Sequence, residues 1–294
     1  MKILIIGGRG YIGSHLAEHL DFDDYDITVF GSQSKDYDNL PESYLCGFDY
    51  IVLLAGHSSV QMCNGDVKAP WRNNVRNFIN LVNKTTNSTK IFYASSASVY
   101  GNTNLRAFSE EYTSSDIINN YDLTKITLDI TAQKYIAEGR NIFGLRFGTV
   151  NGGAPVIRRD LMINSMVYTA LNDNKIFITN RKINRPILSV RDLSRAVKCV
   201  IDTDKFIPGL YNLASFNSTV EEIAKVVSDE TGVDVVDNGT TVGVYDFTTN
   251  TDKFCKTYNF KFKDDIISTT QSVITCYKNQ SPLIVTRDKY FNYK

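Results

Sequence analysis

A glycine-rich turn near the start of the chain is the feature that most constrains its fold. The turn follows the apolar run Lys2–Ile6 and precedes Tyr11–Leu20, which has helical periodicity. Gly7 permits a tight turn, Gly10 lets a pyrophosphate approach the backbone, and Gly13 lets the helix pack on the sheet. The helix N-terminus offers unpaired N–H groups and a positive dipole to phosphates. We therefore predict a dinucleotide site rather than a purely structural turn. The residues assigned to it are Gly7, Arg9, Gly10, Tyr11, Ile12 and Gly13.

The end of the predicted second strand, Asp26–Phe30, bears on the choice of cofactor. A carboxylate at this place usually holds the ribose 2′-hydroxyl of NAD, but the chain has Gly31 there. Ser32 and Lys35 follow and are suited to contact a 2′-phosphate, while Arg9 is placed to meet the adenine. The sequence therefore favours NADP(H) over NAD(H), with plain surface charge as the alternative role for Arg9 and Lys35.

Strands and helices alternate through the first half of the chain. This pattern predicts βαβ units, right-handed crossovers and a Rossmann-type doubly wound parallel sheet of the α/β class. The predicted strands are Lys2–Ile6, Asp26–Phe30, Tyr50–Ala55, Lys90–Ser95 and Ile142–Arg146, and the helices are Tyr11–Leu20, Trp71–Lys84 and Tyr121–Glu138. Between residues 31 and 48, Pro41 and many polar residues make a full helix doubtful.

The second half predicts a smaller mixed α/β lobe that binds the substrate. We expect helices at Arg158–Leu171, Arg191–Asp202 and Thr219–Thr231, and strands at Pro186–Val190 and Leu210–Leu213. Ser218 or Thr219 is predicted to cap the third helix, with Glu222 in its first turn. Residues 1–150 and about 186–203 are assigned to the dinucleotide-binding domain, and about 151–185 and 204–294 to the substrate lobe.

Composition excludes several classes of protein. The 294 residues carry 32 basic and 32 acidic side chains, so a general nucleic-acid binder is not expected. The five cysteines lie far apart, and the pair His15 and His19 lacks a Glu after the first histidine, so neither a disulfide framework nor a metal site is predicted. No apolar run is long enough to span a membrane. We expect a cytoplasmic enzyme or binding protein.

Serine hydroxyls follow the predicted fourth strand, and a tyrosine and a lysine open the next helix. Ser95, Ser96 and Ser98 lie beyond the carboxyl end of the strand, where parallel sheets hold their catalytic groups. Tyr121 and Lys125 are four residues apart, which places them on one helix face. An ordinary helix surface is the alternative interpretation of this pair.

The pairing of these two residues has a chemical reason. A free tyrosine has a pKa near 10, which is too high for a base at neutral pH. A nearby ammonium favours the phenolate and lowers this pKa. A serine hydroxyl can then hold a substrate oxygen while the phenol exchanges a proton with it.

Together these motifs resemble extended short-chain dehydrogenases/reductases, and more narrowly the NAD-dependent epimerase/dehydratase family, which acts on nucleotide sugars. The resemblance covers most of the chain and is strongest up to about residue 200. It implies that Ser96 is the catalytic serine, that Tyr121 is the acid/base and that Lys125 holds the nicotinamide ribose. Further cofactor contacts that it implies are Ala55, Gly56, Asn74 and Ser95.

The same resemblance implies a substrate site and an oligomer. Ser98 lies with Ser96 at the sugar, and Thr149 belongs to the stretch that leads into the sugar site. Arg185 would meet the diphosphate of a nucleotide sugar, with a lobe-interface ion pair as its alternative role. The family usually forms a homodimer through two long helices, here Trp71–Lys84 and Tyr121–Glu138.

Departures from the family pattern narrow the expected reaction. Ala97 and Ser98 stand where the dehydratases place Asp-Glu, so 4,6-dehydration is disfavoured. Hydride transfer at C4 by an epimerase or by a 4-ketoreductase remains, and the sequence does not separate the two. A non-catalytic NAD(P) sensor or scaffold is the alternative, although such proteins commonly lose the tyrosine or the lysine.

Overall fold

A six-stranded parallel sheet forms the centre of the molecule in the computed structural model. The structure describes residues 1–20, 24–31, 36–101, 108–112, 119–203, 205–242, 244–279 and 283–285. The strand order is β10-β5-β4-β3-β1-β2. The strands are β1 (Lys2–Ile6), β2 (Asp26–Phe30), β3 (Tyr50–Leu53), β4 (Lys90–Ser96), β5 (Ile142–Phe147) and β10 (Gly209–Leu213). The order reverses between β1 and β3, which confirms the predicted doubly wound sheet.

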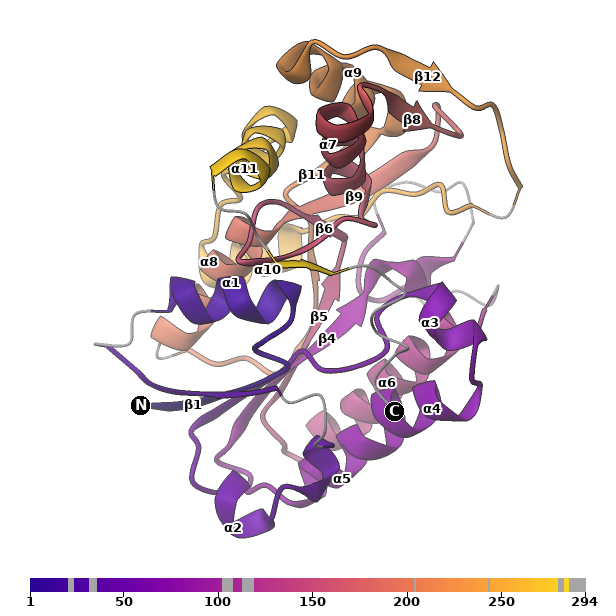
Figure 1. Ribbon diagram of the computed structural model, residues 1–294. Helices are drawn as coiled ribbons and strands as arrows, with labels where there is room; N and C mark the ends of the chain where they lie inside the picture. Colours follow the sequence, from indigo (N-terminus) through magenta and orange to yellow (C-terminus); the bar gives the residue numbers. More distant parts are fainter. Residues whose placement is uncertain are drawn as a thin grey trace.

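Helices cover both faces of this sheet, as Figure 1 shows. Ile3 and Ile5 of β1 pack in the core beneath α1 (Tyr11–His19) and α8 (Val190–Asp202). Leu4 and Ile6 point to the other face and join a second core with α5 (Asn77–Asn83) and α6 (Asn120–Ala137). Continuous apolar runs are what strands covered on both faces require, because alternate side chains enter opposite cores.

Most of the helices predicted between these strands are present, and one of them differs from the prediction. The predicted helix Trp71–Lys84 is divided: α4 (Lys68–Pro70) leads into a π-helix, η2 (Trp71–Arg76), which continues as α5. Between β2 and β3 the described residues form only short turns, η1 (Tyr37–Asn39) and α2 (Glu42–Leu45), in agreement with the doubt about a helix there. The remaining short helices of this half are α3 (Val60–Asn64) and η3 (Ala97–Tyr100).

The upper lobe in Figure 1 is built from discontinuous segments around a three-stranded sheet of order β11-β9-β6. Its strands are β6 (Thr149–Asn151), β9 (Asn184–Ser189) and β11 (Phe216–Thr219), and two smaller sheets pair β8 (Ile176–Ile178) with β12 (Val235–Asp237) and β7 (Val156–Arg158) with β13 (Leu283–Val285). Its helices are α7 (Met162–Asp173), α9 (Val220–Thr231) and α11 (Ile266–Asn279), whereas α10 (Asp252–Tyr258) packs against β10 of the central sheet.

One predicted helix boundary in this lobe is wrong. The helix expected at Arg158–Leu171 begins only at Met162, because Val156–Arg158 pairs with β13 as a strand. The predicted cap of α9 is confirmed, since Thr219 and Glu222 form a reciprocal capping box. The division into two domains stays a prediction. Strand β10, from the stretch assigned to the lobe, completes the six-stranded sheet, and β9, from the stretch assigned to the dinucleotide domain, lies in the lobe sheet.

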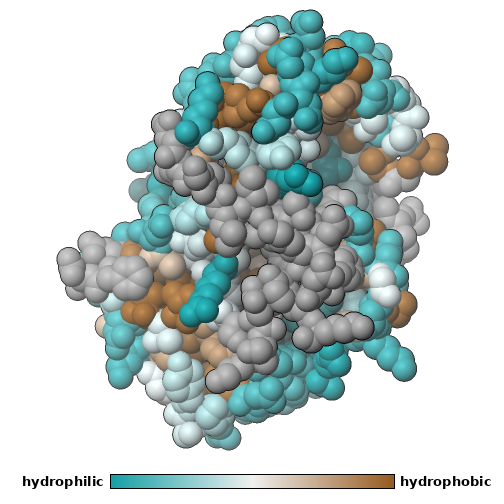
Figure 2. Space-filling model, in the orientation of Figure 1, coloured by the Kyte–Doolittle hydropathy of each residue, from teal (hydrophilic) through white to brown (hydrophobic). Residues whose placement is uncertain are grey.

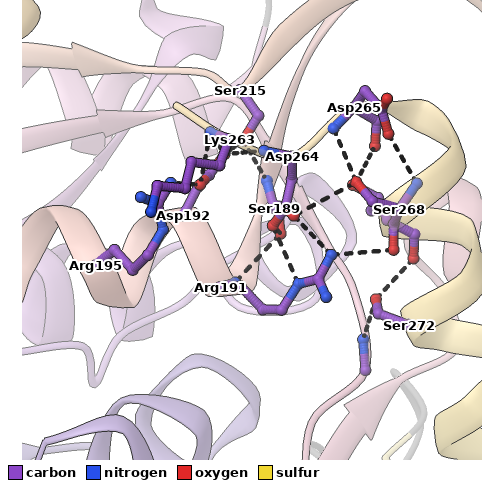
Figure 3. A network of polar contacts seen from close by, with 12 residues as sticks. Ser189, Arg191, Asp192, Arg195, Ser215, Lys263, Asp264, Asp265, Ser268 and Ser272 are labelled. Carbon is purple, nitrogen blue, oxygen red and sulfur yellow. Dashed lines mark hydrogen bonds and ion pairs between the residues drawn. The ribbon is translucent and has the colours of Figure 1, made fainter. Parts of the chain in front are cut away.

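A buried carboxylate ties the start of α8 to the segment before α11 (Figure 3). Asp192 accepts hydrogen bonds from Ser215 Oγ at 2.7 Å and from the N–H of Asp264 at 3.1 Å, and it pairs with Arg195. Asp264 in turn pairs with Arg191 at 2.6 Å. These contacts fix the end of β9, the strand that brings Arg185 to the centre of the molecule.

The visible surface is mainly hydrophilic, and the hydrophobic residues on the face in Figure 2 gather in separate groups rather than in one continuous patch. Among the described residues, every helix is too short or too polar to span a bilayer.

Candidate active site

The glycine turn brings the backbone of three segments close together. Gly7 has a φ of +90°, and a Cβ atom there would lie 2.6 Å from the backbone nitrogen of Ala55. A Cβ atom on Gly13 would lie 2.3 Å from the carbonyl oxygen of Gly7. Gly10 occupies the N-cap of α1, and its N–H donates to Gly7 at 3.0 Å. The turn therefore needs glycine at positions 7 and 13 for steric reasons, and it presents a helix N-terminus at the sheet edge. The predicted approach of a pyrophosphate at Gly10 stays a prediction.

Residues predicted to choose between cofactors are only partly described. Arg9 is exposed, and its Cβ lies beside Gly31 at the end of β2. This location is where the resemblance places the adenosine end of the cofactor. Ser32 and Lys35 lie outside the described residues, so their predicted contacts stay predictions.

Serines at the end of β4 turn into a short 3-10 helix. Ser96 is the N-cap of η3, and its Oγ lies 2.9 Å from Ser98 Oγ and accepts the N–H of Ser98 at 3.2 Å. Ser95 pairs with Arg146 in the register between β4 and β5, and its own Oγ is buried without a partner among the described residues. The sheet edge thus fixes Ser96 through the backbone turn.

The first turn of α6 carries the predicted acid/base pair. Asn119 caps the helix by accepting the N–H of Asp122 at 3.0 Å. Lys125 is 6% exposed, and its Nζ donates to the carbonyl oxygen of Ala94 at 2.8 Å. The same Nζ lies 5.9 Å from the centre of the Tyr121 ring. Helix α6 and strand β4 therefore hold the phenol, the ammonium and the serines at one place.

Burial dominates the proton affinities of this pair. It raises the pKa of Tyr121 to about 12, and the hydrogen bond with the Ser96 side chain opposes the rise. It lowers the pKa of Lys125 to about 8, which Asp129 partly offsets. The sequence-based expectation that the ammonium would bring the pKa of Tyr121 down is thus wrong for the protein alone, because desolvation of the phenolate outweighs any attraction to Lys125.

Asn74 supports the site from behind and does not line it. It is 4% exposed and lies in the π-helix η2. Its Oδ1 accepts the N–H of His57 at 2.8 Å, and its Nδ2 donates to Thr124 Oγ1 at 3.1 Å. A Cβ atom on Gly56 would lie 2.7 Å from Asn74 Oδ1. The asparagine therefore joins the turn after β3 to helix α6.

One pocket between the lobes gathers most of the predicted site. Of the predicted residues it is lined by Tyr11, Ile12, Ala55, Gly56, Ser95, Ser96, Ser98, Tyr121, Lys125, Thr149 and Arg185. Gly7, Arg9, Gly10 and Gly13 do not line it, and the glycines belong to the turn beside Tyr11. The hydroxyl oxygen of Tyr11 faces the upper lobe, where it donates to Gly152 at 2.8 Å.

Three residues that line this pocket, Arg158, Tyr245 and Phe247, were not found from the sequence. The sequence predicted that Arg158 lies in a helix. Its Arg-x-Asp spacing to Asp160 is the one local signal that could have indicated a pocket residue. Tyr245 and Phe247 lie in the stretch after residue 232, where no periodicity indicates an element. Their position follows from long-range contacts.

Two arginines line the pocket, and they differ in how their charges are balanced. Arg185 Nη1 donates to the carbonyl oxygen of Tyr245 at 3.4 Å, while its Nε is buried without a partner among the described residues. Arg158 is 8% exposed, pairs with Asp160 at 2.7 Å and donates to Ser58 Oγ at 3.1 Å. Arg185 thus retains an N–H group for an anion, and Arg158 has a carboxylate that already balances its charge.

These residues fit a dinucleotide cofactor. The glycine turn leaves no room for side chains between β1 and α1, so its backbone can contact a pyrophosphate. The buried hydroxyl of Ser95 and the ammonium of Lys125 lie in the same pocket. Within the described ranges, no cluster of three His, Cys, Asp or Glu side chains suited to a metal ion occurs.

Comparison with known proteins shows the family to which the chain belongs. Residues 3–214 match the model of the NAD dependent epimerase/dehydratase family. The chain belongs to this family. It is 26% identical to protein CapI of Staphylococcus aureus over 234 residues, which is 68% of this chain and 69% of that protein.

Solved structures show the same fold. A UDP-glucuronic acid 4-epimerase from Bacillus cereus, in complex with UDP-glucuronic acid and NAD, has a TM-score of 0.82 at 19% identity, covering 95% of this chain and 99% of that chain. RMD from Pseudomonas aeruginosa, complexed with NADPH, has a TM-score of 0.76 at 17% identity, covering 95% and 100%. The neighbours thus include complexes with each of the two cofactors.

Proposed function

We propose that this member of the family is an NAD(P)-dependent enzyme that acts at C4 of a nucleotide-linked hexose, as an epimerase or a 4-ketoreductase. The observation that carries the proposal is the convergence of Tyr121, Ser96 and Lys125 with Arg185 in one pocket beside the glycine turn. Proton-transfer groups and an anion-binding group are both needed for a sugar that is attached to a diphosphate.

Each residue has a defined part in this reaction. The Ser96 hydroxyl holds the sugar oxygen, and Tyr121 Oη takes or returns its proton. Lys125 holds its ammonium at the carbonyl oxygen of Ala94, within reach of the Tyr121 ring. Arg185 holds the diphosphate and so positions the reacting carbon through remote binding energy. A bound nicotinamide supplies the hydride acceptor or donor.

The cofactor remains a proposal that favours NADP(H). The absence of a carboxylate at Gly31 supports it, and the location of Arg9 beside Gly31 agrees with it. A 4-ketoreductase would exchange NADPH at each turnover, whereas an epimerase would keep its cofactor bound.

A panel of nucleotide sugars separates these reactions. UDP-, dTDP- and GDP-hexoses, and the corresponding 4-keto sugars, are incubated with the enzyme and either cofactor. Epimerisation without a net change in cofactor identifies an epimerase. Loss of one NADPH for each 4-keto sugar identifies a ketoreductase. UDP-glucuronic acid belongs in the panel, because Bacillus cereus UDP-glucuronic acid 4-epimerase shares the fold.

Tyr121→Phe tests the central assignment. Removal of the phenol hydroxyl should lower kcat on the true substrate by about 10³-fold, since proton transfer by a positioned group contributes 10²–10⁴-fold. Binding of cofactor and of UDP should change little. Tyr135→Phe is the control, because its hydroxyl bonds Asn83 at the far end of the same helix. Full activity of Tyr121→Phe would refute the assignment and favour a non-catalytic sensor.

A further inference from the structure

The two lobes meet at the first turn of the catalytic helix. Tyr245 Oη donates to Asp122 Oδ2 at 2.5 Å. Asn119 Nδ2 donates to Tyr245 Oη at 2.6 Å and to Asp122 Oδ2 at 2.7 Å. Asp122 is 1% exposed and directly follows Tyr121 in the chain. We name these three residues the Tyr245 latch.

The same tyrosine also contacts the arginine assigned to the diphosphate. The Arg185 guanidinium lies 5.7 Å from the centre of the Tyr245 ring, and its Nη1 donates to the Tyr245 carbonyl oxygen. The next residue fixes the segment to β9, because Asp246 Oδ1 accepts the N–H of Asn184 at 2.7 Å. One side chain from the upper lobe therefore touches both the anion-binding residue and the cap of α6.

Because Asp122 is buried, its hydrogen bond with Tyr245 depends on the position of the upper lobe. A buried carboxylate is costly unless donors satisfy it. Burial raises the pKa of Asp122, and hydrogen bonding to Tyr245, Ser98 and Asn119 opposes the rise. Tyr245 is the donor among these that comes from the upper lobe. A shift of that lobe would thus remove a donor from the residue next to Tyr121.

We propose that Tyr245 is a positioning residue which couples occupation of Arg185 by the diphosphate of a nucleotide sugar to the placement of the Tyr121 hydroxyl. The inference rests on the proposed function. An anion on Arg185 holds the guanidinium against the Tyr245 ring. The ring then stays on Asp122, and the first turn of α6 holds Tyr121 against Ser96.

The coupling is measured first without turnover, with UDP as the probe. Amide hydrogen exchange in residues 120–125 is followed in the cofactor-loaded protein with and without UDP. In the wild type, UDP should slow this exchange by about fivefold or more. In Tyr245→Phe, UDP should bind with a Kd within about threefold of wild type but should no longer slow the exchange.

Kinetics test the effect on catalysis. Tyr245→Phe should lower kcat about tenfold with little change in KM, since a small misplacement of a catalytic group is costly. Asp122→Ala should behave alike, and the double variant should be no worse than either single one. Asp122→Asn keeps an oxygen that accepts from Tyr245 and should restore most of kcat. Tyr135→Phe is the matched control on the same helix.

Several results would overturn the inference. Equal slowing of exchange by UDP in wild type and Tyr245→Phe would do so, as would an unchanged kcat or additive losses in the double variant. If UDP binds and slows exchange in the wild type but no nucleotide sugar is turned over, the proposed reaction fails and the coupling stands. If UDP does not bind the wild type, both fail.

Discussion

Lys125 is the residue at which burial and charge compete most directly. Its ammonium is almost fully enclosed, donates to the carbonyl oxygen of Ala94 and has a pKa of about 8. An unfolded chain would give this lysine a pKa near 10.4. Below pH 8 both states carry the charge, and the folded protein bears the cost of burying it. Between pH 8 and 10 the folded state loses its proton first, so stability should rise with pH.

Lys125→Met tests this balance. The methionine removes the burial cost at every pH, so its effect on the free energy of unfolding, relative to wild type, should be most favourable at pH 7. This advantage should shrink by roughly 2–3 kcal/mol by pH 10. Urea unfolding at several pH values measures it, with the exposed Lys134→Met as control. A difference that stays constant from pH 7 to 10 would show that Lys125 is not buried as a cation.

The glycine turn offers a matched pair of substitutions. Gly13→Ala would place a Cβ atom 2.3 Å from the Gly7 carbonyl oxygen, and Gly10→Ala would place one at 3.3 Å from the same atom. We expect Gly13→Ala to lower stability by about 1–3 kcal/mol and to weaken cofactor binding as well. Gly10→Ala should keep most of the stability and lose cofactor affinity. Thermal unfolding and cofactor titration measure both, and equal losses of stability would contradict the assigned roles.

Residues that belong to local patterns were found from the sequence, and residues placed by long-range contacts were not. Ser96 follows a strand end, and Tyr121 and Lys125 open a helix, so their positions and the family resemblance together predict a common site. Tyr245 reaches the same pocket through contacts with residues far away in the sequence, such as Asp122, 123 residues earlier, which accepts its hydrogen bond. Nothing in the sequence around Tyr245 encodes that partner.

At the scale of elements, α6 is also anchored by contacts that lie beyond its first turn. Asp129, one turn after Lys125, pairs with Arg146 of β5 at 2.7 Å, and both side chains are buried. Tyr93 of β4 donates to the same carboxylate at 2.8 Å. Helix α6 is thus fixed to both strands that form the floor of the pocket.

Breaking this anchor from one side should be costly. Asp129→Ala leaves the Arg146 guanidinium buried without its carboxylate, and we expect a loss of about 3–5 kcal/mol in the free energy of unfolding. Replacing both, as Asp129→Leu with Arg146→Met, should recover most of that loss because neither charge of the pair is left buried without its partner. Denaturant unfolding of the single and double variants decides this. A double variant as unstable as Asp129→Ala would show that the anchor works through other contacts.

Helices and strands were predicted best where the local pattern of apolar residues fits only one type of element. Lys2–Ile6 and Asp26–Phe30 are strands with the expected bounds. Lys2–Ile6 is a continuous apolar run because it is buried between two layers of helices, whereas Asp26–Phe30 is a half-buried edge strand. The helix expected at Arg158–Leu171 starts late, since pairing with β13 outweighs the local helical pattern around Arg158. That partner strand lies more than 120 residues later, beyond any local signal.

At the scale of the whole molecule, the strand order brings the carboxyl ends of β1, β3, β4 and β5 to one edge, and the upper lobe closes over it. The pocket lies between the two. The homodimer through α5 and α6 stays a prediction.

Cofactor preference depends on the whole folded protein, and it can be measured as the increase in thermal stability that each cofactor causes. A ligand that binds only the folded state stabilises it by about 2.7 kcal/mol at 100 times its Kd. We expect NADPH to raise the thermal midpoint more than NADH at equal concentration, with Lys35→Ala reducing the difference. Thermal unfolding with each cofactor measures this. A larger shift with NADH would show that Gly31 does not exclude NAD(H).

The π-helix η2 affects how the sequence of this region can evolve. A π-helical turn contains one residue more than an α-helical turn. The side chains of α5 are therefore rotated by about 100° about the helix axis, compared with an unbroken α-helix. The face of α5 that packs on the sheet and the side of η2 that carries Asn74 can therefore be selected independently. A single-residue deletion within Trp71–Arg76 would restore α-helical geometry. Either the packing of α5 on the sheet or the contact of Asn74 with α6 would then be lost.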